Sequence, residues 1–116
     1  MSGEISLGEY NLEQAKGMTE ARFQSVVVAA AKREGWLVYH TKYSLGSSPG
    51  YPDLHLVHPG RGLSMFRELK TETGKLSEHQ QKWIEALRAA GADVDVWRPL
   101  DWFERHIDAQ LDPESS

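Results

Sequence analysis

Two short runs of the sequence carry acidic side chains where a β-strand is normally apolar. Asp53 lies in residues 50–57, GYPDLHLV, and Glu68 and Lys70 lie in residues 66–70, FRELK. Side chains alternate between the faces of a strand, so Glu68 and Lys70 project the same way, about 6.6 Å apart. Two carboxylates beside an ammonium suit a divalent cation with oxygen ligands and a fixed positive charge next to it. Such a set of groups can hydrolyse a phosphodiester.

A hairpin would bring the two runs together. They are separated by PGRG at residues 59–62, and pairing across this turn places Asp53 about 5 Å from the second strand. Tyr51 is biased towards extended geometry by the proline after it, and Pro52 suits the first position of a strand. Both features put Asp53 at the mouth of its strand. Taken one at a time, these residues have simpler explanations, as an acid in a turn and an exposed charge pair on a strand.

A helix before the first strand carries a further acid, Glu20. Thr19 is a good N-cap, and the helix is expected to run to about Glu34 before Gly35 ends it. Glu20 and Gln24 lie one turn apart at its start. The helix dipole alone favours an acid in the first turn, which is the simpler explanation for Glu20. The buried stripe expected from helical spacing is Phe23, Val26, Val27 and Ala30.

A capping box at residues 77–80, SEHQ, predicts a second helix that ends at Gly91. Its apolar face is expected to be Trp83, Ile84, Leu87 and Ala90. Gln80 lies one turn before Trp83, so it points towards the sheet or reaches back to cap the helix, and these two roles are about equally favoured.

The remaining elements follow from similar patterns. Residues 36–40 and 94–97 are typical of strands. Residues 101–104, DWFE, form another capping box, which predicts a helix to about residue 111. The residues expected to be buried in that helix are Phe103, Ile107 and Leu111.

The connections offer three candidate contacts to a nucleic-acid backbone. Lys42 and Tyr43 lie in the long loop of residues 41–50, which is rich in Ser, Gly and Pro, and Lys75 lies in the polar connection of residues 71–76. A cation and an aromatic side chain beside the acidic strand could contact a nucleic-acid backbone. A solvated loop explains them nearly as well.

Length and composition restrict the class of protein. The chain has 116 residues, enough for one domain with a modest core, and it has no cysteine, which excludes disulfides and thiolate metal sites. No apolar run reaches membrane-spanning length, and the N-terminus lacks the pattern of a signal peptide. The expectation is a soluble cytoplasmic protein with no membrane partner.

The net charge of −4 is unevenly distributed. Residues 1–17 and 108–116 together hold six acids and one base, so the middle of the chain is slightly basic. The negative total therefore does not exclude a nucleic-acid partner. We expect a flexible arm over residues 1–17 that includes a short helical turn at 12–16, an organised domain over residues 18–111, and an acidic tail over residues 112–116.

The order of these motifs resembles the VRR-NUC family within the PD-(D/E)xK nuclease superfamily. The superfamily motif corresponds to Pro52-Asp53 and Glu68-Leu69-Lys70 on either side of a hairpin. Further marks of the family are Thr19-Glu20 with Gln24, the run Gly50-x-Pro52-Asp53-Leu54, and Leu76-Ser77 with Gln80. The resemblance covers about residues 18–100. It implies an α/β, restriction-endonuclease-like domain with a central mixed β-sheet of about four strands flanked by helices.

The same resemblance implies a metal site. Asp53 and Glu68 would ligate Mg²⁺ or Mn²⁺, assisted by the backbone carbonyl of Leu69, and Glu20 would complete the acidic cluster directly or through water. Such ions prefer oxygen ligands and keep several waters, one of which can become the nucleophile.

Lys70 and Gln80 also receive roles from the resemblance. Lys70 would orient or help activate the attacking water and offset charge on the scissile phosphate. Gln80 would lie at the edge of the site and hold a ligand or a water.

The resemblance further implies a metal-dependent DNA endonuclease. Small stand-alone members, often encoded by phages, resemble Holliday-junction resolvases and act as homodimers, so a two-fold dimer that cleaves branched DNA is the expectation. The alternatives are a monomeric nick- or flap-directed nuclease and a non-catalytic nucleic-acid-binding or protein-interaction module on the same fold. The intact set of two acids and a lysine argues against the last of these.

Overall fold

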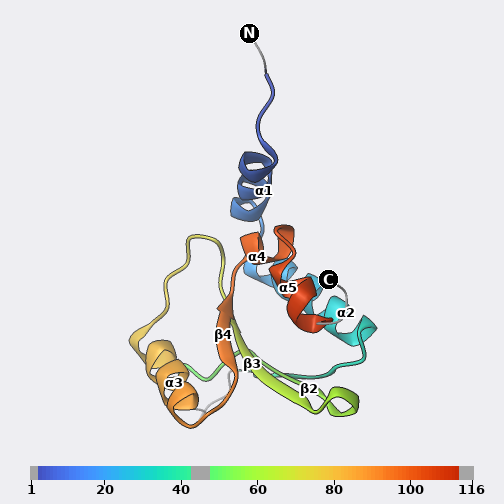
Figure 1. Cartoon of the computed structure of the whole chain (residues 1–116). Coiled ribbons are helices and arrows are strands. Elements are labelled where there is room, and N and C mark those ends of the chain that lie inside the picture. The colour runs from blue at the N-terminus through green and yellow to red at the C-terminus, as the bar shows by residue number, and fades with distance from the viewer. Residues whose placement is uncertain (1–2, 43–47, 113–116) are drawn as a thin grey trace.

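A four-stranded mixed sheet forms the centre of the computed structural model, which describes residues 3–42 and 48–112 (Figure 1). The strands are β1 (Leu37–His40), β2 (Leu54–His58), β3 (Leu63–Leu69) and β4 (Val94–Trp97), in that spatial order. β2 is antiparallel to both β1 and β3, and β4 runs parallel to β3. The predicted architecture of about four strands flanked by helices is therefore confirmed.

The hairpin predicted between the two acid-bearing strands is present. A 3₁₀ turn, η1 (Pro59–Arg61), and Gly62 connect β2 to β3. Gly62 adopts φ 66°, a left-handed conformation that glycine reaches without strain. The two strands pair in a register that places Leu54 opposite Arg67. This is the register expected for two strands joined by a short turn.

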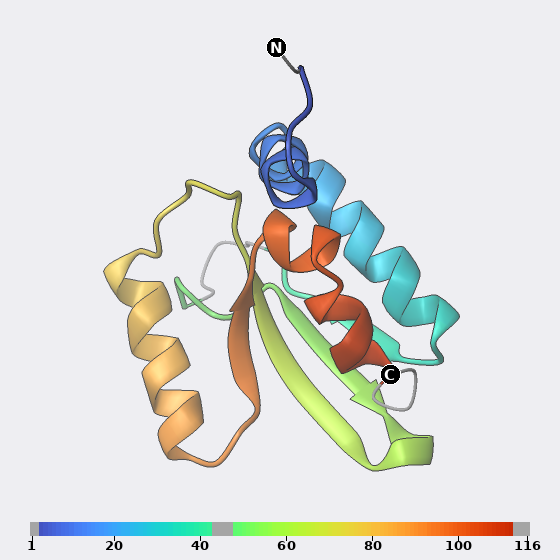
Figure 2. The ribbon, with the colours of Figure 1, turned by 45° about the horizontal axis from the view of Figure 1, so that its top comes forward.

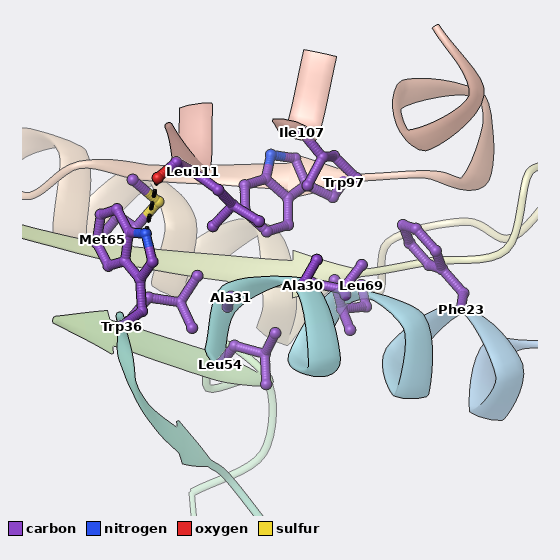
Figure 3. Close-up of a cluster of buried hydrophobic side chains, with 12 residues drawn as sticks. Phe23, Ala30, Ala31, Trp36, Leu54, Met65, Leu69, Trp97, Ile107 and Leu111 are labelled. Carbon is purple, nitrogen blue, oxygen red and sulfur yellow. Dashed lines mark hydrogen bonds between the residues drawn. The ribbon is translucent and has the colours of Figure 1, made fainter. Parts of the chain in front are cut away.

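Helices cover both faces of the sheet (Figure 2). Helices α2 (Glu20–Arg33), α4 (Pro99–Phe103) and α5 (His106–Leu111) lie on one side, and α3 (Glu78–Ala89) packs on the other side beside β4. The main hydrophobic core lies under the first group (Figure 3). Within it, the Trp36 indole N–H donates a 2.9 Å hydrogen bond to the carbonyl of Leu111, which fastens the end of α5 to the start of β1.

Alternation along β3 sorts its side chains as expected. Met65 and Leu69 enter the core, and Arg67 points to the same side. The guanidinium of Arg67 is only 4% exposed, lies 5.1 Å from the ring centre of Trp97, and donates to Asp93 at 2.8 Å and Gln110 at 3.0 Å. A buried cation is thus held by specific acceptors, as burial of charge requires. Phe66 and Glu68 are left on the opposite face.

The N-terminal segment is more ordered than the expected short turn. Residues Leu7–Lys16 form helix α1, whose N-cap Ser6 accepts a hydrogen bond from the N–H of Glu9. Ala15 is fully buried, and α1 contacts α4. The expectation of a turn over residues 12–16 alone was wrong. The helix is stabilised by the cap at Ser6 and by the tertiary contact at Ala15, and neither produces a hydrophobic periodicity that the sequence would show.

Two expected buried stripes are also corrected. In α2, Phe23, Val27 and Ala30 are buried as predicted, but Ala31 takes the place of Val26. In α3 only Ile84 is buried; Trp83 and Leu87 are half-buried, and Ala90, the C-cap, is exposed. Helix α3 packs beside β4 at the edge of the sheet, so the sheet covers only part of its apolar face.

The C-terminal helix predicted from the box at residues 101–104 is two helices. The first begins at Pro99, and its third residue, Asp101, accepts a 2.8 Å hydrogen bond from the N–H of Arg98. Asp101 is therefore the reciprocal partner of the cap rather than the cap itself. Arg105 adopts φ 66° and breaks the helix before α5, where Ile107 and Leu111 are buried as predicted and Phe103 of α4 is only half-buried.

Among the helices in the described part of the chain, none has the length and apolarity needed to cross a bilayer.

Candidate active site

Asp53 and Glu68 face each other across the mouth of the β2–β3 hairpin. Leu54 pairs with Arg67, so the next step of the antiparallel register places Asp53 opposite Glu68. Residues directly opposite in a sheet project to the same side. The charge and the hydrogen-bonding capacity of Asp53 both act on the carboxyl group of Glu68 and raise its pKa. The structure therefore brings together the two acids on which the proposed chemistry depends.

Asp53 is fixed at both its backbone and its side chain. Its carboxylate Oδ2 accepts a 2.8 Å hydrogen bond from the N–H of Leu69, and its carbonyl accepts a 2.8 Å bond from the N–H of Thr41. The side chain of Leu69 is buried in the core on the other face of the sheet. Leu69 thus presents only its backbone to the site, as expected for the residue between Glu68 and Lys70.

Glu68 is almost completely buried, with 1% of its surface exposed. Burial is the main reason that its pKa is raised from 4.5 to about 9, and the hydrogen bond and charge of Asp53 and the charge of Glu20 add to this rise in pKa. Lys70 acts in the opposite direction and lowers the pKa. Without a cation, the Glu68 carboxyl therefore keeps its proton at neutral pH.

Glu20 and Lys70 approach this pair from different elements. Glu20 is exposed in the first turn of α2, directly after the N-cap Thr19, whose hydroxyl accepts from the N–H of Arg22. Lys70 follows β3 and is half-buried, and its N–H donates to the carbonyl of Trp97 at 3.1 Å. The charges of both residues reach Glu68. Glu20 and Lys70 therefore act on Glu68 through their charges, but Glu20 does not join Asp53 and Glu68 in a three-acid metal site within the described residues.

The donor set suits a hard cation. Glu68 Oε2 is buried and has no hydrogen-bond partner within the described residues, so one carboxylate oxygen lacks compensation. Carboxylate oxygens are the ligands that Mg²⁺ and Mn²⁺ prefer. No set of three acidic or histidine side chains in residues 3–42 and 48–112 forms a ready-made metal centre. The preassembled part is the Asp53–Glu68 pair.

Gln80 takes the capping role and also borders the site. Its side-chain oxygen accepts a 2.8 Å hydrogen bond from the N–H of Ser77, and its own N–H donates to the Ser77 hydroxyl at 3.1 Å. The capping role is therefore confirmed. Gln80 also lines a small hollow of about 170 Å³ next to Asp53, and its role at the site stays a prediction. The lining residues are Thr41, Lys42, Ser48, Pro49, Gly50, Tyr51, Asp53 and Gln80.

Of the three residues predicted to contact nucleic acid, the two in the described part of the chain do not lie together. Lys42 is exposed and lines this hollow. Lys75 is exposed on the connection before α3 and is not part of the hollow. Tyr43 lies outside the described residues.

Gly50 joins the acidic strand to α3, a role that the sequence analysis did not assign to it. It adopts φ 88°, and a Cβ at this position would lie 2.4 Å from the carbonyl carbon of His79. Only glycine permits this backbone to lie against the first turn of α3. The glycine three residues before Asp53 is the sequence signal that could have revealed the contact.

Thr41 is a second residue that the sequence analysis missed. Its N–H holds the Asp53 carbonyl, while its hydroxyl oxygen is buried without a partner among the described residues. A threonine in a polar loop gives no sign of this position.

A family model described as the VRR-NUC domain matches residues 10–99, which is most of the chain and includes both acid-bearing strands and α3. The chain belongs to the VRR-NUC domain family. Its Pro52-Asp53 and Glu68-Leu69-Lys70 motifs place this VRR-NUC domain in the PD-(D/E)xK nuclease superfamily.

Solved structures show the same fold. One, described as a VRR_NUC domain, superposes with a TM-score of 0.64 at 32% sequence identity over 77% of this chain and 94% of that chain. Another, a VRR_NUC domain protein, has a TM-score of 0.63 at 24% identity over 83% of this chain and 92% of that one, and so shares the fold.

One curated relative is much larger than this VRR-NUC domain. The Fanconi-associated nuclease 1 homolog of Schizosaccharomyces pombe is 44% identical over 50 residues. The match covers 43% of this chain and 7% of that protein.

Proposed function

We propose that this VRR-NUC domain is a metal-dependent DNA endonuclease that hydrolyses phosphodiester bonds. The observation that carries the proposal is the buried Glu68 opposite the half-buried Asp53, with one Glu68 carboxylate oxygen left without a partner among the described residues and with the charge of Lys70 acting on it. A buried carboxylate next to a second acid is unfavourable unless a proton or a cation compensates its charge. Membership of a nuclease family and the similarity to a Fanconi-associated nuclease support the same reading.

The residues of the pair would hold Mg²⁺ or Mn²⁺, with Leu69 adding its backbone carbonyl and Glu20 adding its charge directly or through water. A bound divalent ion supplies an activated water and neutralises charge on the phosphate. Asp53 is preorganised for this task, because the Leu69 N–H already fixes its carboxylate. Glu68 must release its proton before it can act as a ligand.

Lys70 would act on the phosphate and the attacking water. Its ammonium is a compact charge with three donors, and it emerges on the same side of β3 as Glu68. A fixed cation beside the phosphate stabilises the charge that develops in the transition state. Lys42 and Lys75 would contact the backbone of the DNA on either side.

We further propose that the substrate is branched DNA and that the active form is a homodimer. Leu37 and Tyr39 on the edge strand β1 are 65% and 66% exposed. An edge strand with exposed apolar side chains is a surface that a second copy would cover. A two-fold dimer would provide two cutting centres, as a symmetric junction requires.

The test uses the purified protein and a matched panel of DNA substrates: a four-way junction, a flap, a nicked duplex and a linear duplex. We expect junction cleavage with Mg²⁺ or Mn²⁺, no cleavage with a chelator, and a dimer in light scattering. Cleavage of the flap or nick by a monomer would replace the branched-DNA dimer with a monomeric nuclease. Tight DNA binding with no cleavage under any metal would favour the non-catalytic module.

A further inference from the structure

A second hollow lies on α3, outside the acidic site. Its volume is about 330 Å³, which is within the roughly 300–1,000 Å³ range of small-molecule pockets. The lining residues are Ser48, Pro49, His79, Lys82, Trp83 and Ala86. They come from the first three turns of α3 and from the loop that precedes the acidic strand. We call this hollow the α3 cleft.

The α3 cleft adjoins the hollow beside Asp53. Ser48 and Pro49 line both. Gly50, the next residue, lies directly against the backbone of His79, so the loop and the helix form one continuous wall. A DNA strand bound at the hollow beside Asp53 could therefore continue into the α3 cleft.

The chemistry of the α3 cleft combines an aromatic ring, apolar walls and a cation. The Trp83 ring is half-buried, and Tyr51 supports it edge-on at 5.0 Å between ring centres. Tyr51 in turn contacts Phe66 of β3 at 6.1 Å, so the position of the indole is set by the sheet. Lys82 is exposed at the rim, where its charge complements a phosphate. Aromatic platforms next to cations are typical of sites for unpaired nucleotides.

We propose that the α3 cleft binds one unpaired nucleobase of the DNA, next to the phosphate held at Asp53. This inference rests on the proposed function, since it names the part of the DNA that the site selects. Bases within a duplex are stacked and have to be extruded at a cost in free energy, which is smallest for a base that is already single-stranded. The α3 cleft thus provides a structural reason for a preference for branched DNA that carries single-stranded bases.

The test fills the α3 cleft without removing any contact. Ala86 lines it and is exposed, and Ala89 is exposed on the same helix outside it. Ala86→Leu and Ala89→Leu are therefore matched variants. Binding of a fluorescent oligothymidine and of a blunt-ended linear duplex is measured by anisotropy in chelator, with circular dichroism as the check on folding.

We expect Ala86→Leu to weaken oligothymidine binding by about fivefold to 150-fold, the change that corresponds to the roughly 1–3 kcal/mol of stacking one base. Duplex binding should change by less than about twofold, and Ala89→Leu should bind both DNAs as the wild type does. Equal binding of oligothymidine by the wild type and Ala86→Leu overturns the proposal. So does an equal loss for both variants or for the duplex.

A second measurement uses the wild-type protein, so it does not depend on the folding of a variant. A junction with an abasic nucleotide beside the mapped or candidate cleavage position should bind about fivefold or more weakly than the intact junction. Because binding is measured without metal, its outcome is independent of cleavage. If the protein cleaves DNA but neither Ala86→Leu nor the abasic nucleotide weakens binding, only the proposed base-binding role of the α3 cleft is rejected. If both weaken binding but no DNA is cleaved, only the proposed nuclease activity is rejected.

Discussion

The carboxylate of Asp53 accepts a hydrogen bond from the backbone N–H of Leu69 at 2.8 Å. Where the pairing of β2 and β3 ends, a side-chain oxygen thus satisfies a strand N–H. Asp53 therefore both ends the pairing of β2 and β3 and contributes its carboxylate to the candidate site. Its orientation is fixed by the sheet before any ligand arrives, which lowers the entropy cost of binding one.

Replacement of Lys70 by alanine should abolish cleavage and leave the fold and the metal affinity largely intact. The side chain is half-buried and its backbone N–H bond to Trp97 is unaffected by the change. We expect a loss in rate of about 10²–10³-fold or more, the range for removing one charge-stabilising donor. Rates on the preferred DNA and Mn²⁺ binding by calorimetry check this. Wild-type cleavage by the variant would contradict the role given to Lys70.

The Glu68 carboxyl should make the metal-free protein less stable as the pH rises. Its pKa is about 9 in the folded state and 4.5 ordinarily, so the folded state binds the proton more tightly. The stabilisation is complete below about pH 4.5, declines between 4.5 and 9, and is lost above 9. Glu68→Gln keeps the shape without the titration. Urea unfolding in chelator should show this decline in the wild type and not in Glu68→Gln.

Metal affinity should rise with pH over the same interval. Binding to Glu68 displaces the proton held there, so the apparent affinity for Mn²⁺ should increase by up to about tenfold per pH unit below the pKa. Calorimetry in buffers of different ionisation enthalpy would count the released proton. Release of no proton at pH 7 would show that Glu68 is not a ligand.

Gly50→Ala should disturb the site through the backbone of α3. The added Cβ would meet the His79 carbonyl carbon at 2.4 Å, in a conformation with φ 88°. Gly91→Ala is the matched control, because it has φ 88° and nothing within 4 Å. Strain alone costs about 1–2 kcal/mol, so Gly91→Ala should lose about that much and Gly50→Ala distinctly more. Urea unfolding compares the two variants. Equal losses in the free energy of unfolding would show that α3 moves away from the added Cβ without further cost.

Helix α1 should contribute to stability rather than act as a detached arm. Ala15 is fully buried and Gln14 beside it is exposed. Ala15→Glu places an unpartnered acid at the contact with α4 and should lower the free energy of unfolding by about 1–3 kcal/mol. Gln14→Glu should change it by less than about 0.5 kcal/mol. Thermal unfolding of the two variants decides this, and equal effects would support an arm.

The sequence by itself determined most of the strands and helices and which charged side chains lie on one face of the acidic strand. Alternation in β3 separated Glu68 and Lys70 from Met65 and Leu69, and the turn at residues 59–62 set the hairpin register. These features depend on neighbours along the chain, so periodicity and turn chemistry are sufficient to predict them.

The tertiary structure alone decided how strongly those groups are perturbed and what surrounds them. The burial that raises the pKa of Glu68 comes from the packed sheet, and the close approach of Gly50 to His79 joins segments that are distant in sequence. The order of α1 likewise depends on its contact with α4. Desolvation and packing arise only between elements that are far apart along the chain, and no local pattern in the sequence encodes them.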